Sequence, residues 1–174
     1  FKNFRALRGE VVMINSDNIK FGRIAPENRD HEDVYAFTKA VIMQAKTVER
    51  VLPLPGLRTF YNQKTEGACV GFSTSWQMSI YNTLQKYDAR WLYKMAQTYD
   101  KDPNTVPGRD TGTYVWAAFW VLQHLGHKKL TESISDLKDG IFSYYWGKGA
   151  EHGRTAISLG RPLVVGTNWY GSFN

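Results

Sequence analysis

The chain of 174 residues is long enough for one domain with a hydrophobic core, and its 43% apolar and 14% aromatic residues exclude a disordered protein. It contains no run of eighteen apolar residues, which excludes a transmembrane helix, and its single cysteine excludes an internal disulfide framework and a cysteine-based zinc site. The net charge of +6 indicates a basic surface, but the basic residues are dispersed and no nucleic-acid recognition motif occurs, so we expect no specific nucleic-acid partner.

Residues 1–56 are predicted to form an N-terminal segment ahead of a domain over residues 57–174. The chain starts at Phe1 with neither an initiator methionine nor an apolar signal core, which indicates a processed or truncated product. Within the segment, the apolar run at 9–14 favours a strand, and the apolar spacing at 34–48 favours a helix. A proline-rich stretch at its end is predicted to be extended and leads into the next loop.

The only cysteine, Cys69, stands at the predicted start of a helix over about 69–85. A thiolate on the first turn of a helix meets the positive end of the helix dipole and unpaired backbone N–H groups, which lower its pKa. Gln63, six residues earlier, supplies a side-chain amide that can hold the oxyanion of a tetrahedral intermediate together with the Cys69 N–H. Gly67 lets the backbone pass close to a bound substrate. These residues predict a thiol nucleophile with an oxyanion hole; the alternative is a buried, inert cysteine.

The helix that follows Cys69 is amphipathic. Its large apolar residues recur every four positions: Phe72, Trp76, Ile80 and Leu84. We expect this stripe to pack the helix into the core and to leave Cys69 at the exposed start.

Two further helices are predicted after this one. The first covers 89–99, and the second covers 113–125 and ends at Gly126, a residue type that commonly terminates helices. Between them, residues 100–112 include two prolines and two glycines, which favour a surface loop.

The C-terminal third of the chain has a weaker helical pattern. Residues 141–146 are predicted to be extended, 147–153 to form a loop and 154–159 to form a short helical turn. The apolar run over 162–169 predicts a buried strand.

Two of the four histidines, His124 and His127, are three residues apart and would share one side of a helix that continued past Gly126. Such a pair is half of a metal site, but carboxylate or thiolate partners are not nearby in the sequence. We therefore expect a helix end that interacts with its dipole, and we predict neither a metal nor another cofactor.

The segment around Cys69 resembles the nucleophile segment of papain-like cysteine peptidases. The matching residues, at matching spacing, are Gln63, Gly67, Cys69, Phe72 and Ser73. Val70 takes the place of the aromatic residue that usually follows the cysteine in that family.

A second stretch, 159–170, is similar to the first strand of the β-barrel half of that family. Together with residues 143–146 and the helix start at 112–113, it makes the chain resemble papain-like proteins encoded by bacteriophages of actinobacteria, over about residues 24–174. The resemblance implies an α+β fold in which a helical half carries the nucleophile helix and is followed by the start of an antiparallel β-barrel half.

The resemblance also implies a histidine base well over a hundred residues after the cysteine, and a following asparagine that orients it. The sequence stops at Asn174, and none of its histidines has the expected context: His31, His124, His127 and His152. We therefore expect a papain-like domain that is incomplete at its C-terminus. The alternative is a structural or binding module whose open barrel edge is covered by other virion proteins.

The function implied by the resemblance is that of a cysteine peptidase or amidohydrolase with Cys69 as nucleophile and Gln63 in the oxyanion hole. Its substrate would be a peptide or protein, such as bacterial cell-wall peptides or virion proteins. The alternative is a non-catalytic virion structural or assembly protein that retains the fold. The sequence predicts a soluble protein without a membrane partner and leaves open whether it is part of a phage virion.

Overall fold

The computed structural model describes residues 61–82, 85–131, 137, 139–147 and 149–166 of the chain. The predicted N-terminal segment with its strand, helix and proline-rich stretch lies outside these residues. The domain boundary near residue 57 and Leu84 of the predicted stripe also lie outside them. These expectations stay predictions.

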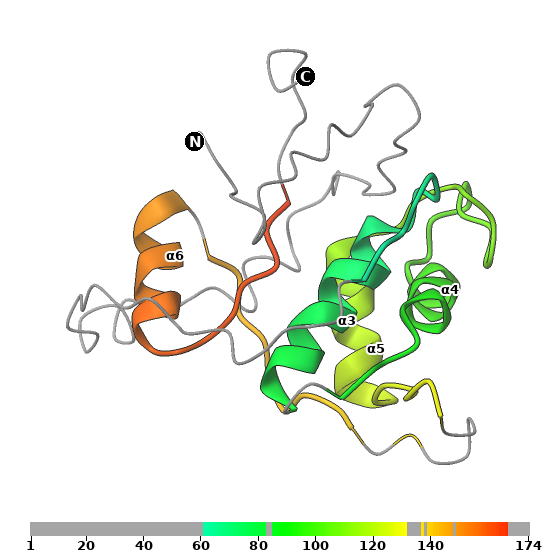
Figure 1. Ribbon diagram of the computed structural model, residues 1–174. Helices are drawn as coiled ribbons and strands as arrows, with labels where there is room; N and C mark the ends of the chain where they lie inside the picture. Colours follow the sequence, from blue (N-terminus) through cyan, green and yellow to red (C-terminus); the bar gives the residue numbers. More distant parts are fainter. Residues whose placement is uncertain (1–60, 83–84, 132–136, 138, 148, 167–174) are drawn as a thin grey trace, which may run out of the picture.

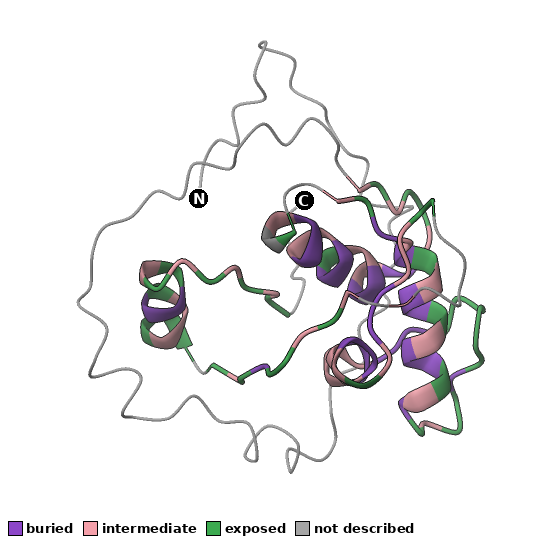
Figure 2. Cartoon of the chain, turned by 90° about the horizontal axis from the view of Figure 1, so that it is seen from below, coloured by how far each residue is buried: buried purple, intermediate pink, exposed green. Residues whose placement is uncertain are grey.

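Four helices occur within the described ranges (Figure 1). They are α3 (Cys69–Tyr81), α4 (Ala89–Tyr99), α5 (Val115–His124) and α6 (Gly149–Ser158). Helix α3 packs against α4 and α5, which also pack against each other, whereas α6 stands apart from this trio. Figure 2 shows buried residues on the inward sides of α3, α4 and α5, and mainly half-buried residues on the outer sides of α3 and α5. The core of the described residues therefore lies among these three helices.

The buried face of α3 consists mainly of small and polar side chains. Val70, Thr74, Ser75 and Met78 are all at most 2% exposed. A Cβ atom placed on Gly71 would lie 2.5 Å from the Ala89 carbonyl oxygen and 2.7 Å from the Tyr93 Cβ. Only a glycine therefore allows α4 to approach α3 this closely.

The predicted role of the α3 stripe is wrong for the residues described. Phe72, Trp76 and Ile80 are only half-buried and line a cleft, while the opposite face packs into the core. A period of about four residues identifies one face of a helix, but it is the same for a core face and for the wall of a cleft. The helix also ends at Tyr81 rather than near 85, with the Asn82 N–H donating to the Met78 carbonyl.

Helices α4 and α5 confirm the two helices predicted after Cys69. Helix α4 has the predicted bounds, and its start is fixed by the Asp88 carboxylate, which accepts from the Trp91 N–H at 3.0 Å. Helix α5 is slightly shorter than predicted and is followed by Gly126, whose φ of +84° suits glycine. The loop predicted over 100–112 is also confirmed.

The C-terminal part differs from its prediction. Residues 149–153 belong to α6 instead of a loop, because Glu151 lies favourably in the first turn and Thr155 and Ala156 are buried, which outweighs the low helix propensity of two glycines. The strand predicted over 162–169 is not confirmed within its described part, 162–166, where Leu163 is 42% exposed and Val165 is 70% exposed.

No strand of a β-barrel is defined within the described ranges, which contain isolated bridges such as Tyr87 with Lys129 and His127 with Asp139. The barrel half of the predicted fold is therefore not confirmed. Among the same residues, no helix is both long and apolar enough to cross a membrane.

Candidate functional site

A cleft of about 470 Å³ runs along the half-buried face of α3 and contains both residues predicted to act in catalysis. Its α3 residues are Cys69, Val70, Phe72, Ser73, Trp76, Gln77 and Ile80. Tyr61 and Gln63 line it from the preceding loop, and residues 162–166 form another wall. The Gln77 Nε2 donates to the Pro162 carbonyl at 2.7 Å, which attaches this wall to α3.

Cys69 is the first residue of α3 and is half-buried. Ala68 precedes the helix without a side-chain cap, so the first-turn N–H groups of α3 are not capped by that residue. The N-terminal end of a helix carries a partial positive charge that favours an anion nearby. This is the position that the sequence predicted for Cys69.

Gln63 lies in the loop before α3, and its side chain has a defined orientation. Its Nε2 donates to the Glu66 carbonyl at 3.0 Å, and the Glu66 N–H donates back to the Gln63 carbonyl at 3.1 Å. Between them the chain turns at Lys64, whose φ is +54°, and the Lys64 N–H donates to the Asn62 side chain at 2.8 Å. The structure thus brings Gln63 and Cys69 to the same cleft.

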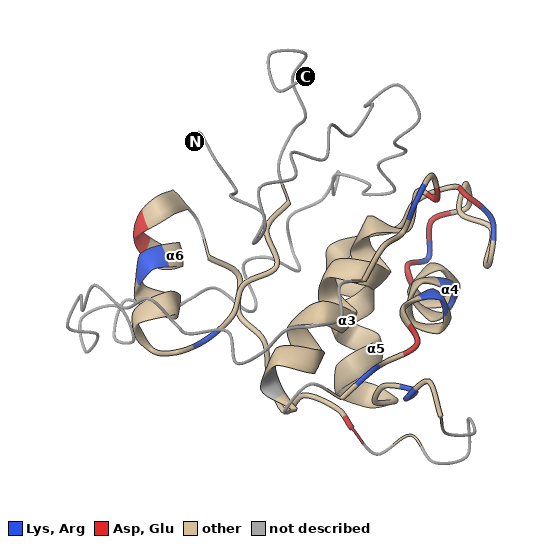
Figure 3. Ribbon diagram, viewed as in Figure 1, with Lys and Arg blue, Asp and Glu red and all other residues tan. Residues whose placement is uncertain are grey.

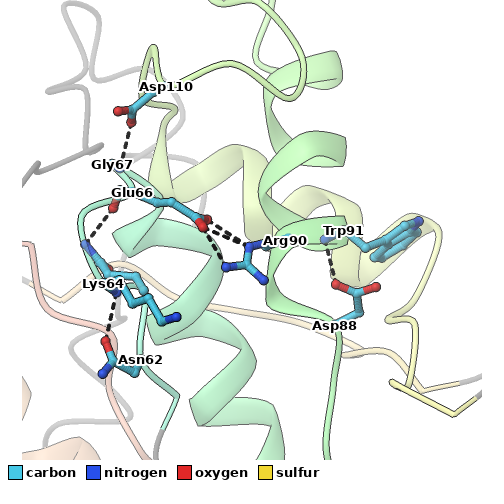
Figure 4. A network of polar contacts seen from close by, with 9 residues as sticks. Asn62, Lys64, Glu66, Gly67, Asp88, Arg90, Trp91 and Asp110 are labelled. Carbon is cyan, nitrogen blue, oxygen red and sulfur yellow. Dashed lines mark hydrogen bonds and ion pairs between the residues drawn. The ribbon is translucent and has the colours of Figure 1, made fainter.

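The loop is also held from two distant parts of the chain (Figure 4). The Glu66 carboxylate pairs with the Arg90 guanidinium of α4, with the shortest contact at 2.6 Å, and the Asp110 Oδ1 accepts from the Gly67 N–H at 2.6 Å. The hydrogen bond with Arg90 holds the pKa of Glu66 below its usual range. Gly67 is buried and makes this backbone contact instead of lining the cleft.

Sequence reasoning missed Glu66, Arg90 and Asp110. Arg90 is 24 residues from Glu66, and Asp110 is 43 residues from Gly67, so no local spacing joins them. Their proximity depends on the packing of α4 and of the 100–112 loop beside α3.

His127 lies on the other side of α3 from the cleft. Its Nε2 is 2.8 Å from the Ser75 Oγ, and its ring stacks on Tyr87 at 4.5 Å and on Trp91 at 5.9 Å. Ser75 belongs to the buried face, and His127 is 1% exposed. Burial lowers the pKa of His127 to about 3, so the ring is neutral at neutral pH. This imidazole is therefore not placed to act as a base for Cys69.

The other histidines in the described ranges also lie away from the cleft walls. His124 is exposed on α5, where its Nδ1 is 2.9 Å from the Trp120 carbonyl, and His152 belongs to α6. The sequence expected His124 and His127 to share a helix end, which is wrong for His127 because α5 ends before it and its ring is buried. His31 lies outside the described residues. Within the described part of the chain, no three His, Cys, Asp or Glu side chains are grouped to hold a metal ion.

No protein-family model matches the chain, and no curated protein matches its sequence. Among solved structures, the chain is similar to xylellain, a cysteine protease from Xylella fastidiosa, with a TM-score of 0.59 and 15% identity. The match covers 86% of this chain and 67% of the xylellain chain. At this identity the likeness shows a shared fold alone.

Proposed function

We propose that the protein is a cysteine hydrolase that cleaves peptide or related amide bonds, with Cys69 as nucleophile and Gln63 in the oxyanion hole. The observation that carries the proposal is that Cys69, at the first position of α3, and the Gln63 side chain line one cleft. The similarity of the fold to that of a cysteine protease supports it.

In the proposed reaction, the Cys69 thiolate attacks the carbonyl carbon of the substrate, and a carbon–sulfur bond forms as the carbonyl oxygen takes up the negative charge. The Gln63 amide and the Cys69 N–H donate to that oxygen. The carbon–nitrogen bond then breaks, and the leaving amine takes a proton. Water hydrolyses the resulting thioester and restores Cys69. A histidine that exchanges these protons would come from outside the described residues.

The composition of the cleft supports an uncharged, partly apolar substrate segment. Figure 3 shows that the ribbons of α3 and α5 carry no Lys, Arg, Asp or Glu, whereas charges lie on α4 and the adjoining loops. Phe72, Trp76 and Ile80 offer apolar surface on one wall. A peptide with apolar side chains fits this surface, and bacterial cell-wall peptides or phage virion proteins are the proposed sources.

The Gln63→Ala variant tests the proposed oxyanion hole. Loss of one oxyanion donor typically lowers turnover about a hundredfold to a thousandfold, so hydrolysis of labelled casein or purified cell-wall peptides should fall by that factor. Because Cys69 is the only cysteine, iodoacetamide uptake measured by mass spectrometry reports this residue alone, and it should continue in Gln63→Ala.

Two further variants provide the controls. Gln85→Ala removes a half-buried glutamine that does not line the cleft, and it should hydrolyse like the parent. Cys69→Ser should not hydrolyse either substrate. Parental activity in Cys69→Ser would overturn the proposed function, and parental activity in Gln63→Ala would overturn the role of that amide.

A second candidate function is that of a non-catalytic virion or assembly protein that retains a papain-like fold. Phe142 is 97% exposed and does not line the cleft, so its aromatic ring is available for contact with a partner chain. An absence of hydrolysis, combined with Cys69 alkylation no faster at pH 6.5 than that of free cysteine, would favour this candidate.

A further inference from the structure

The loop before the nucleophile helix, residues 62–68, is held by side chains from two other parts of the chain (Figure 4). We propose that Glu66, Arg90 and Asp110 are positioning residues, which fix the Gln63 amide and the Cys69 N–H relative to each other. This inference rests on the proposed function and deepens it, because it assigns the residues that orient its oxyanion hole.

Glu66 contacts Gln63 through its backbone and Arg90 through its side chain. Its backbone carbonyl accepts from the Gln63 Nε2, and its backbone N–H donates to the Gln63 carbonyl, so two hydrogen bonds connect these residues. Its carboxylate receives three hydrogen bonds from Arg90, at 2.6, 2.9 and 3.1 Å. A paired guanidinium and carboxylate fix orientation as well as distance. The acceptor of the Gln63 amide moves only with the Glu66 backbone, and the Arg90 pair restrains that movement through the Glu66 side chain.

Arg90 links helix α4 to this loop. It is the second residue of α4, whose start is fixed by Asp88 and whose first turn packs against Gly71 of α3. Its guanidinium also lies over the Phe72 ring, 6.0 Å from the ring centroid. Arg90 thus contacts the loop that carries Gln63 and a wall of the cleft at the same time.

Asp110 holds the other end of the loop. Its Oδ1 accepts from the Gly67 N–H at 2.6 Å, two residues before Cys69. A short bond from a buried N–H to a carboxylate is charge-assisted and stronger than a neutral one. The direction in which the chain enters α3, and with it the direction of the Cys69 N–H, depends on this contact.

The exposure of the Arg90–Glu66 pair indicates that its role is geometric. Its side chains are 63% and 43% exposed, and ion pairs in water contribute little to stability. Removal of Arg90 should therefore leave the protein folded. A small displacement of a catalytic group can nevertheless lower turnover by as much as about a hundredfold.

The test is a double-mutant cycle on kcat and KM for labelled casein peptides. Arg90→Ala should lower kcat about tenfold with little change in KM, and the same substitution in a Gln63→Ala background should have almost no further effect. Arg90→Lys, which keeps the charge without the paired geometry, should be intermediate. Lys128→Met is the matched control, because it removes the Lys128–Asp88 ion pair (2.8 Å) at the start of the same helix without touching the loop.

A readout that does not depend on hydrolysis is hydrogen exchange of the 62–69 backbone. Exchange should be faster in Arg90→Ala and in Asp110→Ala than in the parent, and unchanged in Lys128→Met. Asp110→Asn keeps a side-chain oxygen for the Gly67 N–H and should restore most of the protection and of kcat. Unchanged exchange in both alanine variants would overturn the inference.

The two proposals fail in different ways. If Cys69→Ser retains hydrolysis, the proposed function is wrong. If hydrolysis requires Cys69 and Gln63 but Arg90→Ala has the same effect with and without Gln63, only the positioning role is overturned.

Discussion

The face of α3 that carries Cys69 and the face that carries Ser75 differ in the size and burial of their side chains. The first presents Phe72, Trp76 and Ile80, which are half-buried along the cleft, and the second presents Gly71 and Ser75, which are fully buried. Small residues let α4 and α5 approach α3 closely, and the large ones remain available for a substrate. The larger apolar face of a helix is therefore not always its core face.

Each face also carries a pair of side chains of the types that occur in catalytic sites. The buried face has a serine hydroxyl 2.8 Å from an imidazole, Ser75 and His127, but both groups are closed off from solvent. The cleft face has a half-buried thiol and a carboxamide, Cys69 and Gln63, in reach of a substrate. Access to the cleft therefore distinguishes the candidate site from a pair that is part of the core.

The largest expected difference between the faces is the response of His127 to acid. Its pKa is lowered from 6.5 to about 3 by burial, against the opposing effect of Asp88 and Asp139, so the unfolded chain takes up this proton before the folded one. The contribution of the neutral His127 to the free energy of unfolding is fully present above pH 6.5 and is lost as the pH falls from 6.5 toward 3. The loss should be about 2 kcal/mol at pH 5 and about 4 kcal/mol near pH 3.

Urea unfolding at pH 7, 5 and 4 measures this loss. The neighbouring groups that titrate or carry charge are Tyr87, Asp88, Lys128, Lys129 and Asp139. His127→Phe should reduce the loss between pH 6.5 and 4, whereas His124→Gln removes an exposed histidine as a control. An equal loss in the parent and in His127→Phe would contradict the assignment of the acid response to the buried face.

The next effect concerns the contact between α3 and α4. Gly71→Ala places a Cβ 2.5 Å from a backbone oxygen of α4, which cannot move without displacing the helix, so we expect a loss of about 3 kcal/mol. Gly153→Ala in α6 is the control, because its Cβ would lie 3.6 Å from the Leu163 Cδ1, an ordinary contact. That variant should be neutral or more stable by up to about 1 kcal/mol. Comparable urea midpoints for both variants would contradict the close packing of α3 on α4.

The parts of the fold that the sequence predicted depend on local signals. Asp88 marks the start of α4 and Gly126 follows the end of α5, and both are terminators that act within one turn. In α6 the local signal failed, because two glycines disfavour a helix that the burial of Thr155 and Ala156 stabilises. Propensity is a weak indicator where packing decides.

The candidate site was predicted only where its residues are close in sequence. Gln63 and Cys69 are six residues apart and line one cleft, and their catalytic roles stay predictions. The contacts of Arg90 and Asp110 with the loop, and the burial of His127 against Ser75, join residues 24 to 52 positions apart. Such contacts follow from how the helices pack, which no spacing within one segment records.

The smallest effect compares two serines on opposite faces of α3. Ser79 is 5% exposed, donates to the Ser75 carbonyl and lies 3.0 Å from the Tyr61 hydroxyl, whereas Ser73 is exposed in the cleft and donates to the Cys69 carbonyl at 2.7 Å. Ser79→Ala removes one contact of the half-buried Tyr61 hydroxyl, which keeps its hydrogen bonds with the Tyr87 backbone, and should lower the free energy of unfolding by about 1 kcal/mol. Ser73→Ala removes a bond that water replaces, so its change should stay within about 0.5 kcal/mol. Thermal melts of the two variants measure the difference. If Ser73→Ala were the more destabilising, α3 would be buried on its cleft side as well, and the contrast between a packed face and an accessible face would not hold.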